Sequence, residues 1–325
     1  MLLKLQAIVA ALLASLGVLS CQKAEEKART SPSTYPIPIT ATTGMIADVI
    51  REIGGDKVVV TTLIGEGSDP HLYKPTRSDL ISLNEADLIF YNGLKLEGKM
   101  EDIFTKMSQS KKVVAVTEAL AQDPSVLLHD ENHHDPHVWM DVALWKKAAL
   151  AIQNTLQDFD TTNSESYALN AQSLMDQLED LDNYARTSLA TIPQQQRILV
   201  TAHDAFGYLG KAYGIEVKGI QGLSTESEAG VKDIEELVKF LVAKKIPSVF
   251  VETSVSDQNV KALLEGAKAK GHQVTIGGEL FSDAMGPAGT YQGTYLGMID
   301  HNVTTITRAL GGTAPAKGFQ EKLSE

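Results

Sequence analysis

The chain has little cysteine and no excess of positive charge, and both shortages exclude classes of function. Cys21 is the one cysteine among 325 residues, so the mature chain can form no internal disulfide and offers no thiolate metal site. Lysine and arginine number 29 against 41 aspartate and glutamate residues, which gives a formal net charge of −12. Because nucleic-acid binding needs a basic face, the composition argues against it. An acidic surface suits a cationic ligand but does not by itself indicate one.

A long apolar run at the N-terminus is typical of an export signal. Lys4 precedes the almost wholly apolar stretch from Leu5 to Val18, which closes at Val18-Leu19-Ser20-Cys21. The run is too short to span a membrane and nothing anchors its far side. A lone cysteine at this place resembles a bacterial lipobox, in which the thiol is acylated and becomes the new N-terminus. We therefore expect a signal peptide at 1–20 and a lipid on Cys21 that anchors an exported protein on the periplasmic or cell-surface side. The alternative is an uncleaved segment with a buried thiol.

The pattern beyond Cys21 predicts a polar tether followed by two α/β lobes. Residues 21–38 carry mostly charged and small polar side chains, and 43% of the chain is apolar, enough for two domains. Alternation of strands and helices predicts parallel sheets with helices on both faces. We expect strands at 37–42, 58–64, 88–91 and 113–116 with helices at 45–53 and 78–84, then strands at 198–201, 216–220, 248–251 and 273–276 with helices ending at Tyr213 and at 231–245, 258–270 and 291–310.

A single long helix at 164–192 is predicted between the two lobes, which we place at 39–163 and 193–325. The segment contains no internal glycine or proline and Pro193 ends it. Its apolar face is formed by Tyr167, Leu174, Leu178, Leu181 and Tyr184, which fall at helical spacing. At about 1.5 Å per residue such a helix spans roughly 40 Å. The expected fold is therefore α/β, with two Rossmann-like lobes joined by one rigid backbone helix.

Three of the eight histidines stand in loops beyond a strand or before a helix. They are His71 in Ser68-Asp69-Pro70-His71, His137 in Asp135-Pro136-His137 and His203 in Thr201-Ala202-His203. Ligands of open α/β sheets bind at such loops, and imidazole is the commonest transition-metal ligand. Asp283, after the last strand, is the best-placed fourth donor, so that each lobe would supply two donors to a metal in the cleft between them.

Spacing alone does not establish this site, because the donors are too far apart for a local metal motif. An isolated histidine is more often a surface or core residue satisfied by a hydrogen bond. The repeated Asp-Pro-His favours function, since proline stiffens the turn that carries each histidine. Three imidazoles and a carboxylate, without sulfur, suit Zn²⁺, Mn²⁺ or Fe²⁺.

Four segments, SDPHLY, DPHVWMD, TAHDAFGY and GGELFSDAMG, resemble in order and context the TroA-like metal receptors of ABC importers, solute-binding family 9. The resemblance covers about 40–310. It implies a monomeric binding protein that delivers Zn²⁺ or Mn²⁺, or Fe²⁺, to an ABC permease with its cytoplasmic ATPase. It also implies that the metal ligands are His71, His137, His203 and Asp283. The third ligand is the histidine variant, where some manganese receptors have glutamate.

Other features give weaker predictions. Asp141 and Asp204 adjoin ligands and Glu252 ends a strand, so each is a candidate to accept the outer N–H of an imidazole. The loop with His129, His133 and His134 is too short to indicate more than a solvated segment, with low-affinity metal capture as the alternative. Thr225-Glu226-Ser227-Glu228 matches a helix capping box.

Two other classes of function were weighed against the receptor. A secreted zinc-dependent hydrolase would need an open metal position and a general base, and the sequence has no HExxH motif. An adhesin would need an adhesive module, which the sequence does not offer.

Overall fold

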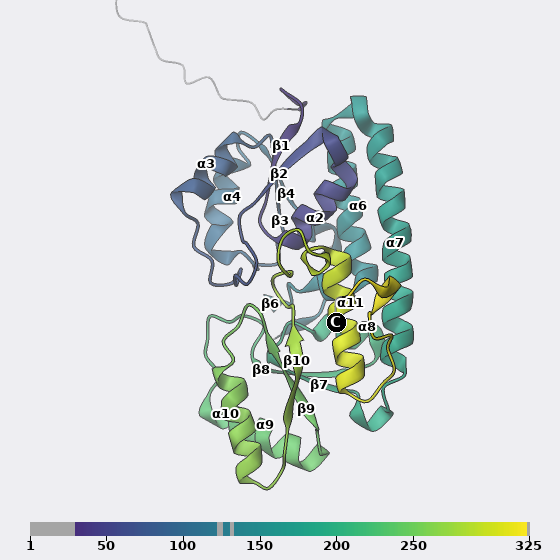
Figure 1. Cartoon of the computed structure of the whole chain (residues 1–325). Helices are drawn as coiled ribbons and strands as arrows, with labels where there is room; N and C mark the ends of the chain where they lie inside the picture. The colour runs from purple at the N-terminus through teal and green to yellow at the C-terminus, as the bar shows by residue number, and fades with distance from the viewer. Residues whose placement is uncertain (1–29, 122–125, 131–132, 324–325) are drawn as a thin grey trace, which may run out of the picture.

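Two α/β lobes lie end to end, and long helices run along one side of both (Figure 1). The computed structural model describes residues 30–121, 126–130 and 133–323. The predicted signal peptide at 1–20 and Cys21 lie outside these residues. No helix in the described part of the chain is long and apolar enough to cross a membrane.

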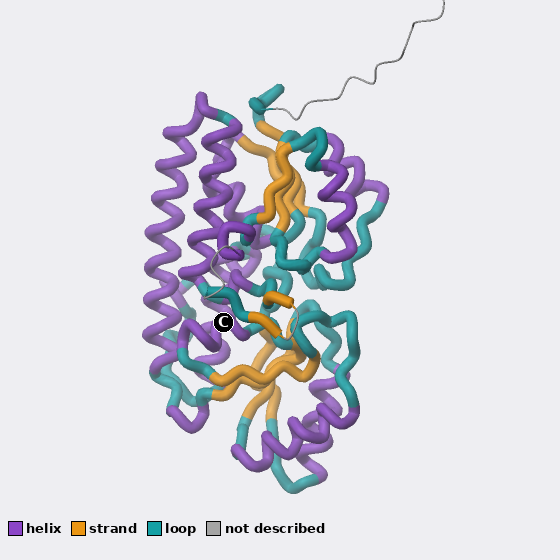
Figure 2. The backbone as a smooth tube through the Cα atoms, turned by 180° about the vertical axis from the view of Figure 1, so that it is seen from behind, coloured by secondary structure: helices purple, strands orange, loops and turns teal. Residues whose placement is uncertain are grey.

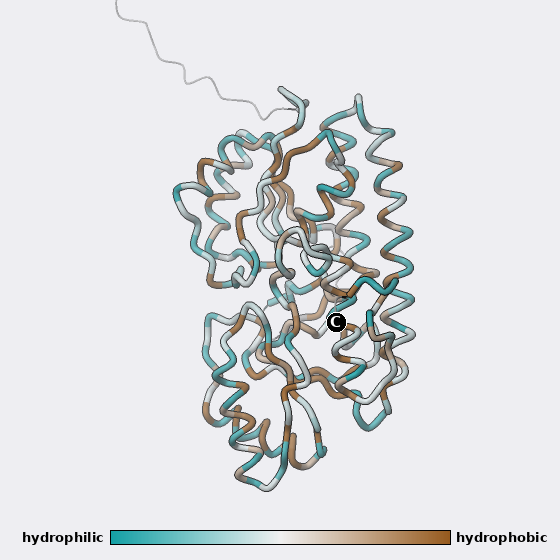
Figure 3. The backbone as a smooth tube through the Cα atoms, viewed as in Figure 1, coloured by the Kyte–Doolittle hydropathy of each residue, from teal (hydrophilic) through white to brown (hydrophobic). Residues whose placement is uncertain are grey.

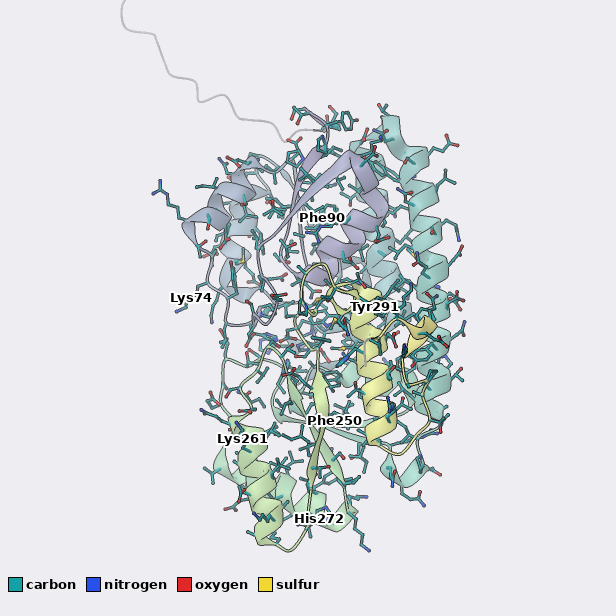
Figure 4. All side chains as sticks on the ribbon, viewed as in Figure 1. Lys74, Phe90, Phe250, Lys261, His272 and Tyr291 are labelled. Carbon is teal, nitrogen blue, oxygen red and sulfur yellow. The ribbon has the colours of Figure 1, made fainter. Side chains whose placement is uncertain are left out.

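The N-terminal lobe is built on a four-stranded parallel sheet in the order β2-β1-β3-β4. Its central strand β1 places Ile39 between Val60 of β2 and Leu88 of β3. Phe90 on β3 is completely buried in the middle of the lobe (Figure 4). The strands are β1 (Ile37–Ala41), β2 (Val58–Thr62), β3 (Leu88–Tyr91) and β4 (Lys112–Ala115), and the helices are α2 (Gly44–Gly54), α3 (Arg77–Glu85), α4 (Glu101–Met107) and α5 (Glu118–Ala121).

The C-terminal lobe holds two parallel strand pairs, β7 with β8 and β9 with β10, and β7 packs beside β9. Phe250 on β9 is buried at its centre (Figure 4). The strands are β7 (Ile198–His203), β8 (Glu216–Gln221), β9 (Ser248–Glu252) and β10 (Thr275–Leu280), and the helices are α8 (Gly207–Tyr213), α9 (Val231–Lys244), α10 (Gln258–Ala269) and α11 (Tyr295–Ala309).

The long helix is α7, Ser164–Ala190, an uninterrupted helix of 27 residues. It packs against α6 (Val142–Phe159), α2 and α11, and Figure 2 shows α6 and α7 side by side. Four residues of the predicted face are buried and Tyr184 is half-buried, as the spacing indicated. The buried four are Tyr167, Leu174, Leu178 and Leu181.

One hydrophobic core joins the two lobes. It runs from Ile39 and Met45 in the N-terminal lobe through Leu178 of α7 to Leu209 and Met298 in the C-terminal lobe. Hydrophobic residues gather on the strands, while hydrophilic residues follow the outer helices (Figure 3). The lobes are therefore held together by shared packing as well as by the covalent path through α7.

The predicted fold class is confirmed, and several elements differ from expectation, among them the short helices α4 and α5, which were not predicted. Strand β10 begins at Thr275 and continues to Leu280, beyond the predicted end at Ile276, because a register shift next to Gly278 lets the strand pass two glycines. Helix α6 is an element that the sequence analysis did not predict. Asp141 caps its first turn by accepting the N–H groups of Ala143 and Leu144.

Candidate metal centre

The structure brings the four predicted donors together between the lobes. His71 follows β2 and His137 precedes a short 3₁₀ turn at Val138–Met140. His203 is the last residue of β7, and Asp283 follows β10. Their candidate ligand atoms all lie within 4.8 Å of one another, and at most 6% of any of the four residues is exposed. Residues up to 212 positions apart thus meet because parallel strands of both lobes end at the same place.

The two Asp-Pro-His turns have the same local structure. In each, an aspartate Oδ1 accepts the backbone N–H of the histidine two residues later, at 2.8 Å from Asp69 to His71 and 2.9 Å from Asp135 to His137. This Asx turn, together with the fixed φ of the intervening proline, determines the direction of the histidine side chain. The repeated Asp-Pro-His motif therefore forms the same turn twice, and each turn carries one of the two histidines that the N-terminal lobe contributes.

The donor separations match the edges of a tetrahedron around a small cation. The Nε2 atoms of His71 and His137 are 3.2 Å apart, and the Asp283 oxygens lie 3.4 Å from Nε2 of His137, 3.2 Å from that of His203 and 3.8 Å from that of His71. Donors at about 2.0–2.1 Å from a tetrahedral zinc ion lie roughly 3.4 Å from one another. The four side chains can therefore hold one ion with little rearrangement.

Several polar atoms in this cluster are buried without a hydrogen-bond partner. They are Nε2 of His203 and both carboxylate oxygens of Asp283; the 3.2 Å approach between the two residues is too poorly aligned to be a hydrogen bond. Buried polar groups are normally hydrogen-bonded, so three unsatisfied atoms that face one point need an explanation. A bound cation would satisfy all three.

Burial and the mutual charges set the protonation of the cluster. Burial lowers the pKa of His71 to about 3, which keeps its imidazole neutral and able to donate a lone pair. Burial alone would raise the pKa of Asp283, but the three imidazoles, His203 foremost, lower it below its usual value. For His203, burial acts to lower the pKa, but the carboxylates of Glu252 and Asp283 raise it well above its usual value. An ionised carboxylate thus stands between a neutral His71 imidazole and a His203 imidazole whose charged form its carboxylate neighbours favour.

Two carboxylates accept the outer N–H groups of the imidazoles. Nδ1 of His137 lies 2.7 Å from Asp135 Oδ1, and Nδ1 of His203 lies 2.5 Å from Glu252 Oε2. With a proton on Nδ1, each ring directs the lone pair of Nε2 toward the site. Glu252 thus has the predicted position behind a ligand, and Asp135, which was not predicted, has the same position behind His137.

The other two predicted carboxylates do not hold the outer nitrogens of His137 and His203. Asp141 caps helix α6, and the outer nitrogen of His137 is taken by Asp135 instead. Asp204 adjoins His203, but Glu252 occupies the outer nitrogen of that ring. Neighbours in the chain are poor candidates because successive side chains near a strand end point to different sides.

The histidine-rich loop forms a short antiparallel hairpin in which His129 pairs with His134. The side chains of His133 and His134 are exposed and are not among the four converging donors. Thr225 does not cap a helix, because α9 begins only at Val231, and the capping-box prediction is wrong.

Comparison with known proteins identifies the fold with that of a family of metal receptors. The family model described as "Zinc-uptake complex component A periplasmic" matches residues 39–309. This chain belongs to that family. Its members are solute-binding receptors of metal ABC importers and are not enzymes, and nothing in the comparisons supports the hydrolase alternative.

Two relatives named for different metals have the same sequence identity to this chain. It is 47% identical over 274 residues to the manganese-binding lipoprotein MntA of Bacillus subtilis, covering 84% of this chain and 90% of MntA. It is also 47% identical over 274 residues to the zinc-binding protein TroA of Treponema pallidum, covering 84% and 89%. A solved structure of TroA superposes with a TM-score of 0.82 over 84% of this chain and 99% of that one. The resemblance noted in the sequence is therefore confirmed.

Proposed function

We propose that this receptor captures one Zn²⁺ or Mn²⁺ ion outside the cytoplasm and delivers it to an ABC permease. The observation that supports this most directly is the buried set of four donor atoms with three unsatisfied hydrogen-bonding positions. Receptors of this family work with a permease and its cytoplasmic ATPase. The donor set without sulfur also accommodates Fe²⁺. By the Irving–Williams order the isolated site should bind zinc more tightly than manganese, so the physiological cargo depends on metal supply as well as on the site.

The proposal includes His71, His137, His203 and Asp283 as the metal ligands, with Asp135 and Glu252 behind two of them. It also includes a monomeric receptor held to the membrane by a lipid on Cys21. Near the start of the described residues, the hydroxyl of Tyr35 donates to Asp160 Oδ1 at 2.6 Å and holds the segment before β1 beside the end of α6. The N-terminal end of β1 lies at the end of the N-terminal lobe that is farther from the C-terminal lobe (Figure 1).

The lobes that we propose, 39–163 and 193–325 on either side of a linking helix at 164–192, divide the donors equally. His71 and His137 come from the first, and His203 and Asp283 from the second. Metal binding would therefore bridge the lobes, and each lobe alone would bind metal weakly.

Single replacement of each ligand by alanine tests the site. Metal affinity should fall about ten- to a hundred-fold or more, since even partners behind the ligands contribute that much. Trp139 can report binding, because its buried ring lies 5.3 Å from the His137 ring. His272→Ala, at the far end of the C-terminal lobe, is the matched control and should bind metal normally (Figure 4).

Wild-type affinity in the His203→Ala variant would remove that residue from the site, and a wild-type protein that takes up no stoichiometric metal would contradict the receptor proposal. Metal analysis of protein from the native host, with uptake of labelled manganese and zinc in a deletion strain, would identify the cargo.

A further inference from the structure

The loop between β8 and α9, residues 222–230, reaches across to the N-terminal lobe beside the turn that carries His71. We call it the mouth loop. Within it, Thr225 is only 7% exposed although it belongs to no helix or strand. Its hydroxyl donates to Oδ2 of Asp69 in the N-terminal lobe at 2.5 Å. The hydroxyl of this buried threonine therefore forms a contact between the two lobes and does not serve only the turn to which Thr225 belongs.

Asp69 connects that contact to a proposed metal ligand. While Oδ2 accepts the Thr225 hydroxyl, Oδ1 accepts the backbone N–H of His71 at 2.8 Å. One carboxylate therefore joins the mouth loop of one lobe to the turn that carries a donor of the other. The side chain of the corresponding Asp135 acts within its own turn, where Oδ1 accepts both the backbone N–H and Nδ1 of His137. The two Asp-Pro-His turns are thus held from the other lobe in different ways: the His71 turn through the side chain of Asp69, and the His137 turn through the carbonyl of Asp135, which accepts the Tyr208 hydroxyl at 2.9 Å.

The other end of the mouth loop is fixed beside a second donor. Gln221, the last residue of β8, is the register partner of His203 on β7. Its side-chain amide donates to the carbonyl of Ser227 at 3.2 Å and folds the loop back over the strand ends. A continuous path of contacts therefore runs from the His203 strand through the mouth loop and Asp69 to His71.

A second contact between the mouth loop and the N-terminal lobe is a partly exposed ion pair. Lys99 of the N-terminal lobe lies 3.0 Å from Glu226, and the two side chains are 33% and 55% exposed. Exposed pairs contribute little to stability, so the buried Thr225–Asp69 bond is the stronger of the two cross-cleft contacts of this loop.

We propose that Thr225 is a positioning residue for metal retention: its hydrogen bond to Asp69 holds the His71 turn closed, and breaking that bond starts metal release. This rests on the proposed function of the site. The uninterrupted α7 and the core shared between the lobes resist a large hinge motion, so an ion that leaves needs a local opening. Freeing the His71 turn removes one donor without moving a lobe.

Release rates of protein loaded with Zn²⁺ or Mn²⁺ alone test the proposal, measured by stopped-flow transfer to excess chelator. Thr225→Val keeps the shape of the side chain and loses the hydroxyl, and it should release metal about ten-fold faster, as expected for loss of a hydrogen bond to a charged group. Thr225→Ser keeps the hydroxyl and should release metal at nearly the wild-type rate. Glu226→Gln, which affects only the ion pair with Lys99, should change the rate less than about two-fold.

A double-mutant cycle with Asp69→Asn keeps the test decisive if one variant is unstable. Once Asp69 is replaced, adding Thr225→Val should cause little further acceleration, because the shared bond is already weakened. A wild-type release rate in Thr225→Val, or equal acceleration in Thr225→Val and Thr225→Ser, would overturn the proposal. Each variant is first shown to take up one metal ion per chain: failure of the wild type at that step counts against the metal site itself, whereas normal loading with unchanged release counts against Thr225 alone.

Discussion

Replacing Glu252 by glutamine measures the contribution of a carboxylate that supports the site from behind a ligand. Glu252 is 4% exposed and accepts two hydrogen bonds from the same residue: the backbone N–H of His203 at 2.8 Å and its Nδ1–H at 2.5 Å. Both contacts require an acceptor, and an amide offers one oxygen where the carboxylate offers two. One of the two bonds must therefore be lost in the variant.

The expected loss follows from the geometry of the ring. If the amide nitrogen turns toward Nδ1, the imidazole must carry its proton on Nε2, the atom that lies 3.2 Å from Asp283 and faces the metal position. If it turns toward the backbone instead, two N–H groups oppose each other. A hydrogen bond to a charged group is worth about 1.5–3 kcal/mol, which corresponds to roughly a ten- to hundred-fold weaker metal affinity.

Competition with a chromophoric chelator measures the affinity, and Glu279→Gln is the matched control. Glu279 is exposed on β10 and pairs with Val251, the neighbour of Glu252, so its replacement removes the same charge nearby without touching an imidazole. The reasoning fails if Glu252→Gln binds metal within about two-fold of wild type. It also fails if Glu279→Gln weakens binding equally, because the effect would then be a long-range charge effect.

Three further predictions concern other parts of the molecule. Cys21→Ala should abolish lipid labelling and leave the protein outside the membrane fraction or unprocessed, and a labelled variant would contradict the anchor. Burial raises the pKa of Asp48 from 3.8 to about 6, so the stability it contributes is complete below pH 4 and is lost as pH rises through about 6. Asp48→Asn should accordingly gain roughly 2–3 kcal/mol in unfolding free energy over wild type at pH 7 and almost nothing at pH 3.5; an equal gain at both pH values in urea titrations would argue against this. Metal binding should change the radius of gyration in solution scattering by less than about 1 Å, because α7 has no break at which to bend, and a larger decrease would show a hinge.

The four converging donors were predictable because each stands at the end of a strand, in a loop beyond a strand or before a helix. His203 closes β7 and Asp283 follows β10, and the parallel arrangement directs such ends to one side. The repeated Asp-Pro-His added a local signal that the structure explains as an Asx turn. The long helix was predictable for the same kind of reason, since its spacing and its lack of glycine and proline are local properties.

The residues that hydrogen-bond to the ligands and their turns were harder to predict from the sequence. Glu252 accepts its hydrogen bonds from a residue 49 positions away, and Thr225 donates to one 156 positions away. The motif around Thr225 satisfied a local pattern, yet tertiary contact decided its role. Asp135 could have been found, because the repeat places an aspartate two residues before each histidine. Helix α6 could also have been found, from the capping residue Asp141 and the helical spacing of apolar residues from Leu144 to Phe159.

The hydrophobic core that passes from one lobe to the other limits how this receptor can be altered. Its residues come from β1 and α2, from α6 and α7, and from α8 and α11, so no cut through the chain separates two self-contained halves. A hybrid that joined the first lobe of one relative to the second lobe of another would have to match side chains across the whole length of α7. Exchange of a whole lobe is therefore a poor route to a different metal preference. A new metal preference has to come from single side chains around the cleft, one substitution at a time.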